Sequence, residues 1–130
     1  MVTLDQVQTS LIVEDDFIIA MEMAERLERL GCRDVQTAST VESALEAVRK
    51  GVQFAVLEVS VCGKSCARIA EMLTALGIPF IYFTGYPQNT FPDLPDAPWL
   101  AKPADEVDVE LAISDALNRG WKPPEPSVEA

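Results

Sequence analysis

The chain has 130 residues, of which 48% are hydrophobic, and it carries a net charge of −11. This length suits one compact core and is too short for two. The negative charge would repel a nucleic-acid backbone or an anionic membrane surface, so we expect neither as a partner. The chain has no run of about 18 apolar residues, which excludes a transmembrane helix.

The chain contains no histidine and three cysteines. The absence of histidine excludes Ser-His-Asp and Cys-His catalysis and argues against a zinc site. The cysteines lack the spacing of a disulfide framework, and the N-terminus lacks the basic and apolar regions of a secretory leader. We therefore expect a cytoplasmic protein.

Short apolar segments alternate with segments of helical periodicity along most of the chain. Short apolar runs are typical of buried strands, whereas apolar residues at every third or fourth position are typical of amphipathic helices. The second helical segment begins with Ser39-Thr40-Val41-Glu42, a predicted capping box. In chain order we expect a strand at 10–13, a helix at 16–30, a strand at 35–38, a helix from 39 through 48, a strand at 54–57, a helix at 65–76, strands at 79–83 and 99–101, and a helix at 105–119.

The alternation of strands and helices predicts an α/β fold with a doubly wound, five-stranded parallel sheet and helices on both faces. Three of the strands are apolar on both faces, as a sheet covered on both sides requires. The segment 85–98, between the last two strands, contains four prolines. Since interior prolines break helices, we expect the fourth helix to be missing or irregular. We assign 1–119 to the domain and 120–130 to a Pro-rich, disordered tail.

Polar side chains follow four of the predicted strands. In the common strand order 2-1-3-4-5, the carboxyl ends of these strands meet at the functional edge of the sheet. Clustered carboxylates favour a hard cation such as Mg²⁺, and a hydroxyl and an ammonium facing them could hold the oxygens of a phosphoryl group. The residues at these ends are Glu14, Asp15 and Asp16, then Glu58, then Thr84, then Lys102 followed by Pro103.

Over about 10–119 this arrangement resembles the receiver domain of bacterial two-component response regulators, a family with a flavodoxin-like fold. The run Tyr82-Phe83-Thr84-Gly85-Tyr86, followed by prolines, is similar to the receiver subclass nicknamed FAT GUY, which tends to lack a regular fourth helix. The resemblance implies a role for each matching position.

By this resemblance, an acidic pair and a main-chain carbonyl bind Mg²⁺, a threonine and a lysine grip the phosphoryl group, and an aromatic residue acts as a rotamer switch. The lysine is followed by a proline, usually through a cis bond. Asp16 is an additional acid beside the pair, and its role stays open. The matching positions are Glu14 and Asp15 for the pair, Glu58 for the acceptor and further ligand, Ser60 for the carbonyl, Thr84 and Lys102 for the phosphoryl group, Pro103 for the cis proline and Trp99 for the switch.

The chain departs from the family at the phosphoacceptor, where Glu58 replaces the aspartate. Glutamate is longer by one methylene, about 1.5 Å, and a displacement of about 1 Å can cost about a hundredfold in rate. Three interpretations stay open. Glu58 imitates the phosphorylated aspartate and locks an active-like state, or the site is defunct and the fold serves as a binding surface, or Glu58 or another group still accepts phosphate.

We expect a non-catalytic signalling module without an output domain of its own, since the chain ends soon after the last predicted helix. Its partner would be a protein: a histidine kinase, a phosphotransfer protein or a downstream effector, with a homodimer as a further alternative. The segments 85–98 and 105–119 would select this partner, with Tyr86 and Phe91 as candidate anchors.

Two functions of other classes remain alternatives. A Mg²⁺-dependent phosphatase-like enzyme could use the same acids, but it would need an aspartate nucleophile or a well-placed base. A flavodoxin-like cofactor binder would need a phosphate-cradling loop after the first strand. The acids at 14–16 would repel phosphate at that position.

Overall fold

A five-stranded parallel sheet forms the centre of the computed structural model, which describes residues 2–120. The strands lie in the order β2-β1-β3-β6-β7, so the predicted order 2-1-3-4-5 is confirmed. All four strand pairs of the sheet are parallel. Their bounds are β1 Thr9–Val13, β2 Asp34–Ala38, β3 Phe54–Leu57, β6 Phe80–Thr84 and β7 Trp99–Ala101.

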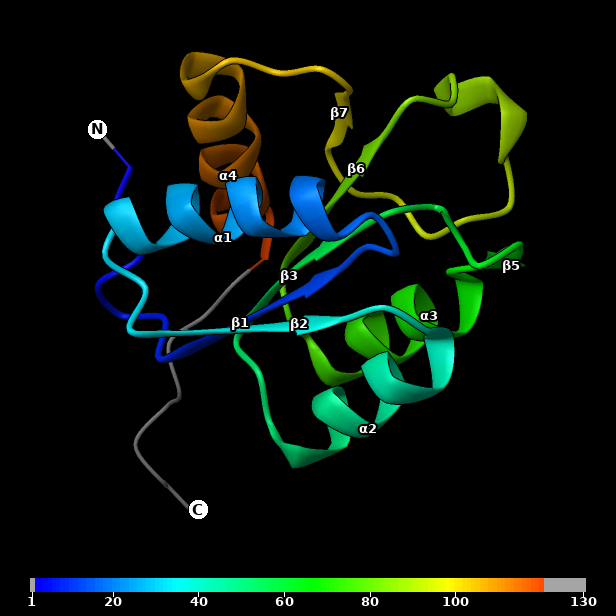
Figure 1. The fold of residues 1–130 in the computed structure, drawn as a ribbon, viewed down its shortest axis with the longest axis horizontal. Coiled ribbons are helices and arrows are strands. Elements are labelled where there is room, and N and C mark those ends of the chain that lie inside the picture. Colours follow the sequence, from blue (N-terminus) through cyan, green and yellow to red (C-terminus); the bar gives the residue numbers. More distant parts are fainter. Residues whose placement is uncertain (1, 121–130) are drawn as a thin grey trace.

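Helices cover both faces of the sheet, as the alternating pattern predicts (Figure 1). One face carries α1 and α4, and the other carries α2 and α3. Along β1, Leu11 and Val13 pack into one apolar cluster while Ile12 packs into the other. Alternate side chains of each strand therefore pack into two apolar cores, one on each face of the sheet. The helices are α1 Phe17–Arg29, α2 Val41–Lys50, α3 Ala67–Leu76 and α4 Glu106–Gly120.

The starts of α1 and α2 are capped by side chains. The Asp16 carboxylate accepts hydrogen bonds from the N–H groups of Ile18 and Ile19. At α2 a capping box is present, but it joins Thr40 and Ser43. The predicted box over 39–42 was therefore wrong by one residue, because serine and threonine are adjacent here and either can take the cap position.

No α-helix lies between β6 and β7, which confirms the prediction from the four prolines. This crossover, residues 85–98, contains only the short 3-10 helix η1 (Gln88–Thr90). Two side chains of the sheet hold it: the Tyr82 hydroxyl donates to the Pro95 carbonyl at 2.6 Å, and Trp99 Nε1 donates to the Tyr86 carbonyl at 2.9 Å.

A small hairpin after β3 was not predicted from the sequence. It pairs β4 (Ser60–Val61) with β5 (Lys64–Ser65) in antiparallel register. The predicted tail at 120–130 lies outside the described residues, apart from Gly120, which ends α4. None of the helices within 2–120 has the length and hydropathy needed to cross a bilayer.

Candidate functional site

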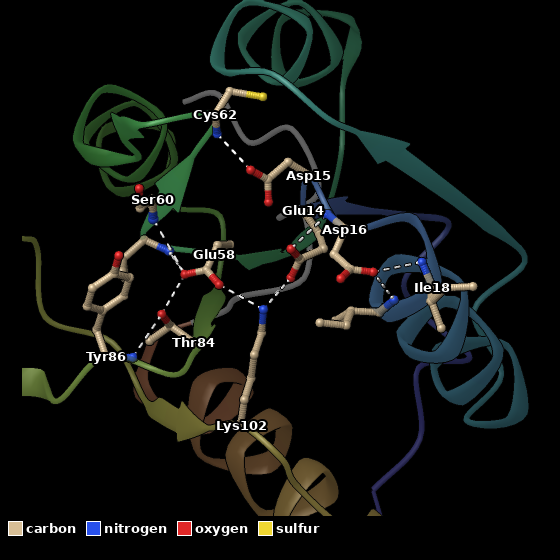
Figure 2. Close-up of polar contacts among 12 residues, drawn as sticks. Glu14, Asp15, Asp16, Ile18, Glu58, Ser60, Cys62, Thr84, Tyr86 and Lys102 are labelled. Atoms are coloured by element: carbon tan, nitrogen blue, oxygen red, sulfur yellow. Dashed lines mark hydrogen bonds and ion pairs between the residues drawn. The ribbon is translucent and has the colours of Figure 1, made fainter.

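Four side chains from distant parts of the chain converge beyond the carboxyl ends of the strands (Figure 2). Glu14 follows β1, Glu58 follows β3, Thr84 ends β6 and Lys102 follows β7. Glu14, Glu58 and Thr84 are buried, with 5%, 8% and 0% of their surface exposed. The sequence therefore correctly placed these four groups at one edge of the sheet.

Lys102 joins the two buried glutamates. Its Nζ lies 2.7 Å from Glu14 Oε1 and 2.7 Å from Glu58 Oε1. Burial acts to lower the pKa of Lys102, but the hydrogen bonds and charges of the two carboxylates outweigh it and raise the pKa. Burial raises the pKa of Glu14, because the loss of water destabilises its charged form more than the hydrogen bond from Lys102 stabilises it. The ammonium thus lies between two carboxylates and offsets part of their mutual repulsion.

Hydrogen bonds engage both carboxylate oxygens of Glu58. Oε1 accepts from Lys102, while Oε2 accepts from the Thr84 hydroxyl at 2.5 Å and from the Val59 N–H at 2.7 Å. The N–H of Ser60 lies 3.4 Å from the same oxygen. Glu58 therefore points toward Thr84 and Lys102.

Within residues 2–120, the carboxylates of Asp15 and Asp16 form no hydrogen bond with Glu58, Thr84 or Lys102. The Asp15 carboxylate accepts a hydrogen bond from the Cys62 N–H at 2.8 Å, and this bond lowers the pKa of Asp15. Asp16 caps α1 with its side chain, and its N–H donates to Glu14 Oε2 at 3.1 Å. The role of Asp16 that the sequence left open is therefore, at least, that of a helix cap.

A chain of contacts leads from the site to the crossover. The Tyr86 N–H donates to the Thr84 hydroxyl oxygen at 3.3 Å, and the Tyr86 carbonyl accepts from the Trp99 indole. The Trp99 ring packs on Tyr82 at 5.1 Å between ring centroids and on Phe91 at 6.4 Å. Trp99 and Thr84 thus both contact the main chain of Tyr86.

Two contacts of the site were missed by sequence reasoning. Lys102 Nζ lies 5.5 Å from the centroid of the Phe83 ring, and Asp15 is held by a main-chain group of the β4–β5 hairpin. Phe83 could have been found from its place before Thr84 in an apolar strand. The Cys62 N–H has no sequence signal, because its direction depends on the left-handed conformation of Cys62, with a φ of 52°. The Lys102–Pro103 bond is cis, which confirms the expectation from the resemblance.

Comparison with solved structures identifies the family. SdrG from Sphingomonas melonis Fr1 is 35% identical, with a TM-score of 0.76, and the match covers 86% of this chain and 98% of SdrG. The receiver (REC) domain of the PhyR response regulator from Erythrobacter litoralis is 29% identical, with a TM-score of 0.77, over 92% and 96% of the two chains. The chain belongs to the response regulator receiver family.

The receiver is also similar to a longer regulator. It is 29% identical over 119 residues to the phyllosphere-induced regulator PhyR of Methylorubrum extorquens, a match that covers 87% of this chain and 45% of PhyR. The receiver thus spans about half the length of this curated relative. No protein-family profile matches the chain. Together these similarities place the receiver among the signalling domains of two-component systems.

Receiver domains generally bind Mg²⁺. Within residues 2–120, however, no group of three acidic, cysteine or histidine side chains is arranged to hold a metal ion. The Lys102 ammonium pairs with one carboxylate oxygen of Glu14 and one of Glu58, and the Asp15 carboxylate accepts a hydrogen bond from the Cys62 N–H. In this conformation the donor set does not fit Mg²⁺, and the ligand roles that the resemblance implies for residues 14–16, Glu58 and the Ser60 carbonyl would require these contacts to break.

Proposed function

We propose that this receiver is held in an active-like state by Glu58, whose carboxylate imitates the phosphorylated aspartate of related domains. The observation that carries the proposal is the set of donors on that carboxylate. Glu58 contacts the Thr84 hydroxyl and the Lys102 ammonium, the two groups that the resemblance assigns to the phosphoryl oxygens. A negative charge thus sits among these donors without a phosphodonor.

The stem of Glu58 explains how the carboxylate arrives there. One additional methylene moves the carboxylate by about 1.5 Å, in the direction in which a phosphoryl group would extend from a shorter side chain. The N–H groups of Val59 and Ser60 donate further hydrogen bonds to Oε2 of Glu58, the oxygen that also accepts from Thr84. The imitation has fewer oxygens and less charge than a phosphate, so we expect a weaker lock than phosphorylation gives.

The same contacts argue against phosphorylation of Glu58. A nucleophilic carboxylate attacks through an oxygen lone pair that must lie in line with its phosphodonor, and hydrogen bonds to that oxygen weaken the nucleophile. Both oxygens of Glu58 are already hydrogen bonded, one of them to a cation. We therefore propose a domain without enzymatic activity, in which neither the phosphorelay nor the phosphatase alternative operates through Glu58.

The receiver would act through a protein partner, which we propose is a histidine kinase, a phosphotransfer protein or a downstream effector. Apolar side chains are exposed at the start of α1, next to the site: Phe17 is 72% exposed and Ile18 is 61% exposed. Exposed apolar groups beside a charged site favour protein contacts. The free cysteines fit the proposed cytoplasmic location.

The test compares the wild type with Glu58→Gln by NMR, both without phosphodonor. Glutamine keeps the length of the side chain and removes its charge. We expect the amide signals of Thr84 and Tyr86 and the indole signal of Trp99 to move, because the Lys102 and Thr84 contacts weaken. Glu58→Asp should move the same signals, because its shorter stem draws the carboxylate away from Thr84.

A matched control is Glu46→Gln, on the exposed face of α2, which should leave these signals in place. The wild type should also show no phosphoryl adduct by intact mass after incubation with acetyl phosphate and Mg²⁺. Unchanged Thr84 and Trp99 signals in both Glu58 variants would favour a defunct site, and an adduct on Glu58 would favour a working phosphoacceptor.

A further inference from the structure

The outer edge of β7 has unpaired main-chain groups. β7 ends the sheet, with β6 as its neighbour on the inner side. The N–H and C=O groups of Leu100 face β6. This follows from the parallel register of the two strands and from the hydrogen bond that the Lys102 N–H donates to the Thr84 carbonyl. The N–H and C=O groups of Trp99 and Ala101 therefore point outward. Within residues 2–120, no main-chain hydrogen bond engages these outward groups.

A groove of about 520 Å³ runs beside this edge, lined by residues of β7, the end of the crossover and α4. Trp99, Leu111 and Ala112 supply apolar walls, and Leu111 is 64% exposed. The crossover beside the groove forms only the 3-10 turn η1, and Gln88 of this turn lines the groove. An edge strand next to an open apolar groove is suited to receive a further strand.

The groove is negatively charged. Asp96, Asp108, Asp115 and Arg119 line it. Arg119 is shared by Asp96, at 2.8 Å, and Asp115, at 3.0 Å. The carboxylate of Asp108 forms no ion pair with any residue in 2–120. With three acids to one cation, the groove favours a basic occupant.

We infer that the groove binds an extended, lysine- or arginine-containing segment of a protein partner, which pairs with β7 as an added strand. Main-chain bonds to Trp99 and Ala101, about 6.6 Å apart along the strand, would supply affinity. Basic side chains facing Asp108 and Asp115 would supply selectivity. This inference rests on the proposed function and names the chemistry of its partner. A second copy of this chain, with a charge of −11, is disfavoured as the occupant.

The test uses the peptide KVKVKVK, acetylated and amidated, titrated into the ¹⁵N-labelled protein. We expect saturable shifts that centre on the Trp99 and Ala101 amides, and slower hydrogen exchange at both. Ala101→Pro removes one outward N–H and leaves the pairing with β6 intact, since proline is tolerated on edge strands. Asp108→Lys reverses the unpaired charge. Each variant should weaken binding at least tenfold.

The matched control is Asp93→Lys, an exposed acid of the crossover outside the groove, which should leave the affinity within about twofold. The peptide KVKPKVK has the same charge but cannot complete a strand, and it should bind at least tenfold more weakly. Equal affinity for the two peptides would show that the peptide binds through charge alone and not as an added strand, which would overturn the inference. No saturable binding at millimolar peptide, or shifts centred on another face, would also overturn it.

These outcomes are separate from those of the proposed function. The Glu58 variants are compared without peptide, whereas the groove is titrated in the wild type. A change at Thr84 in Glu58→Gln together with no peptide binding would retain the proposed state and reject the groove. Binding of the peptide to the wild type, together with unchanged Thr84 signals in Glu58→Gln, would support the groove as a binding site and contradict the proposed active-like state.

Discussion

The Lys102 ammonium lies 2.7 Å from the Glu58 carboxylate, although 43 residues separate them in the chain and both are largely removed from water. A second carboxylate, that of Glu14, accepts from the same ammonium. Neither glutamate could remain charged in this position without a cation, because burial penalises an unpaired charge. Two carboxylates thus share one cation, and the three side chains form one coupled unit, so replacing one member should change the stability of the contacts that the others make.

Replacing Lys102 with methionine should strongly destabilise the fold. The change leaves two buried carboxylates facing each other, and the loss of one partner of a buried pair typically costs about 3–5 kcal/mol. Urea unfolding at pH 7 measures the loss. Lys64→Met, which breaks the exposed pair with Glu42, should have little effect. A loss for Lys102→Met no larger than that for Lys64→Met would contradict this coupling of the three side chains.

Mg²⁺ should affect this variant and the wild type differently. In the wild type Lys102 occupies the carboxylate oxygens, so millimolar Mg²⁺ should leave the melting temperature unchanged. In Lys102→Met the uncompensated carboxylates should bind Mg²⁺, and the melting temperature should rise because a ligand stabilises the state that binds it. Thermal unfolding with Mg²⁺ or with EDTA provides the measurement. A clear increase for the wild type would show that the acids rearrange around a metal.

The raised pKa of Glu14 gives a pH dependence with a definite sign. Between its ordinary value of 4.5 and its raised value, the folded protein binds more protons at Glu14 than the unfolded chain does. The contribution of Glu14 to stability is therefore fully present below that window and is lost as pH rises through it. Glu14→Gln should flatten this slope in urea unfolding between pH 4 and 7.

Glu42 provides a control of opposite sign for this measurement. Its pKa is lowered, first by the hydrogen bond from Lys64, so its contribution is present above its ordinary value and is lost as pH falls. Glu42→Gln should therefore change how the free energy of unfolding depends on pH at the acid end of the range. A slope that survives in Glu14→Gln would assign the titration to another group.

The three thiols should differ in reactivity. Cys62 is exposed, whereas Cys32 and Cys66 are buried, and burial raises the pKa of Cys66 to about 12. Since the thiolate is the reactive form, a thiol reagent at pH 8 should label Cys62 rapidly in the folded protein. Mass spectrometry should then find one label per native chain and three after unfolding in urea. Rapid labelling of Cys66 in the native state would show that the β4–β5 hairpin opens.

Local patterns in the sequence determined the architecture of this protein. The two-faced apolar strands at 10–13, 54–57 and 79–83 required helices on both sides of the sheet, and the four prolines of 85–98 excluded an α-helix from the crossover. These signals suffice because strand burial and proline geometry act over a few neighbouring residues. The same topology placed Glu14, Glu58, Thr84 and Lys102 at one edge.

Only the tertiary structure decided how those groups use one another. Lys102 bridges Glu14 and Glu58, whereas Asp15, adjacent to Glu14, turns to the Cys62 N–H. The direction of a side chain at a strand end depends on sheet register, on the hairpin after β3 and on competition among donors from separate segments. These are long-range contacts, and no local pattern specifies them.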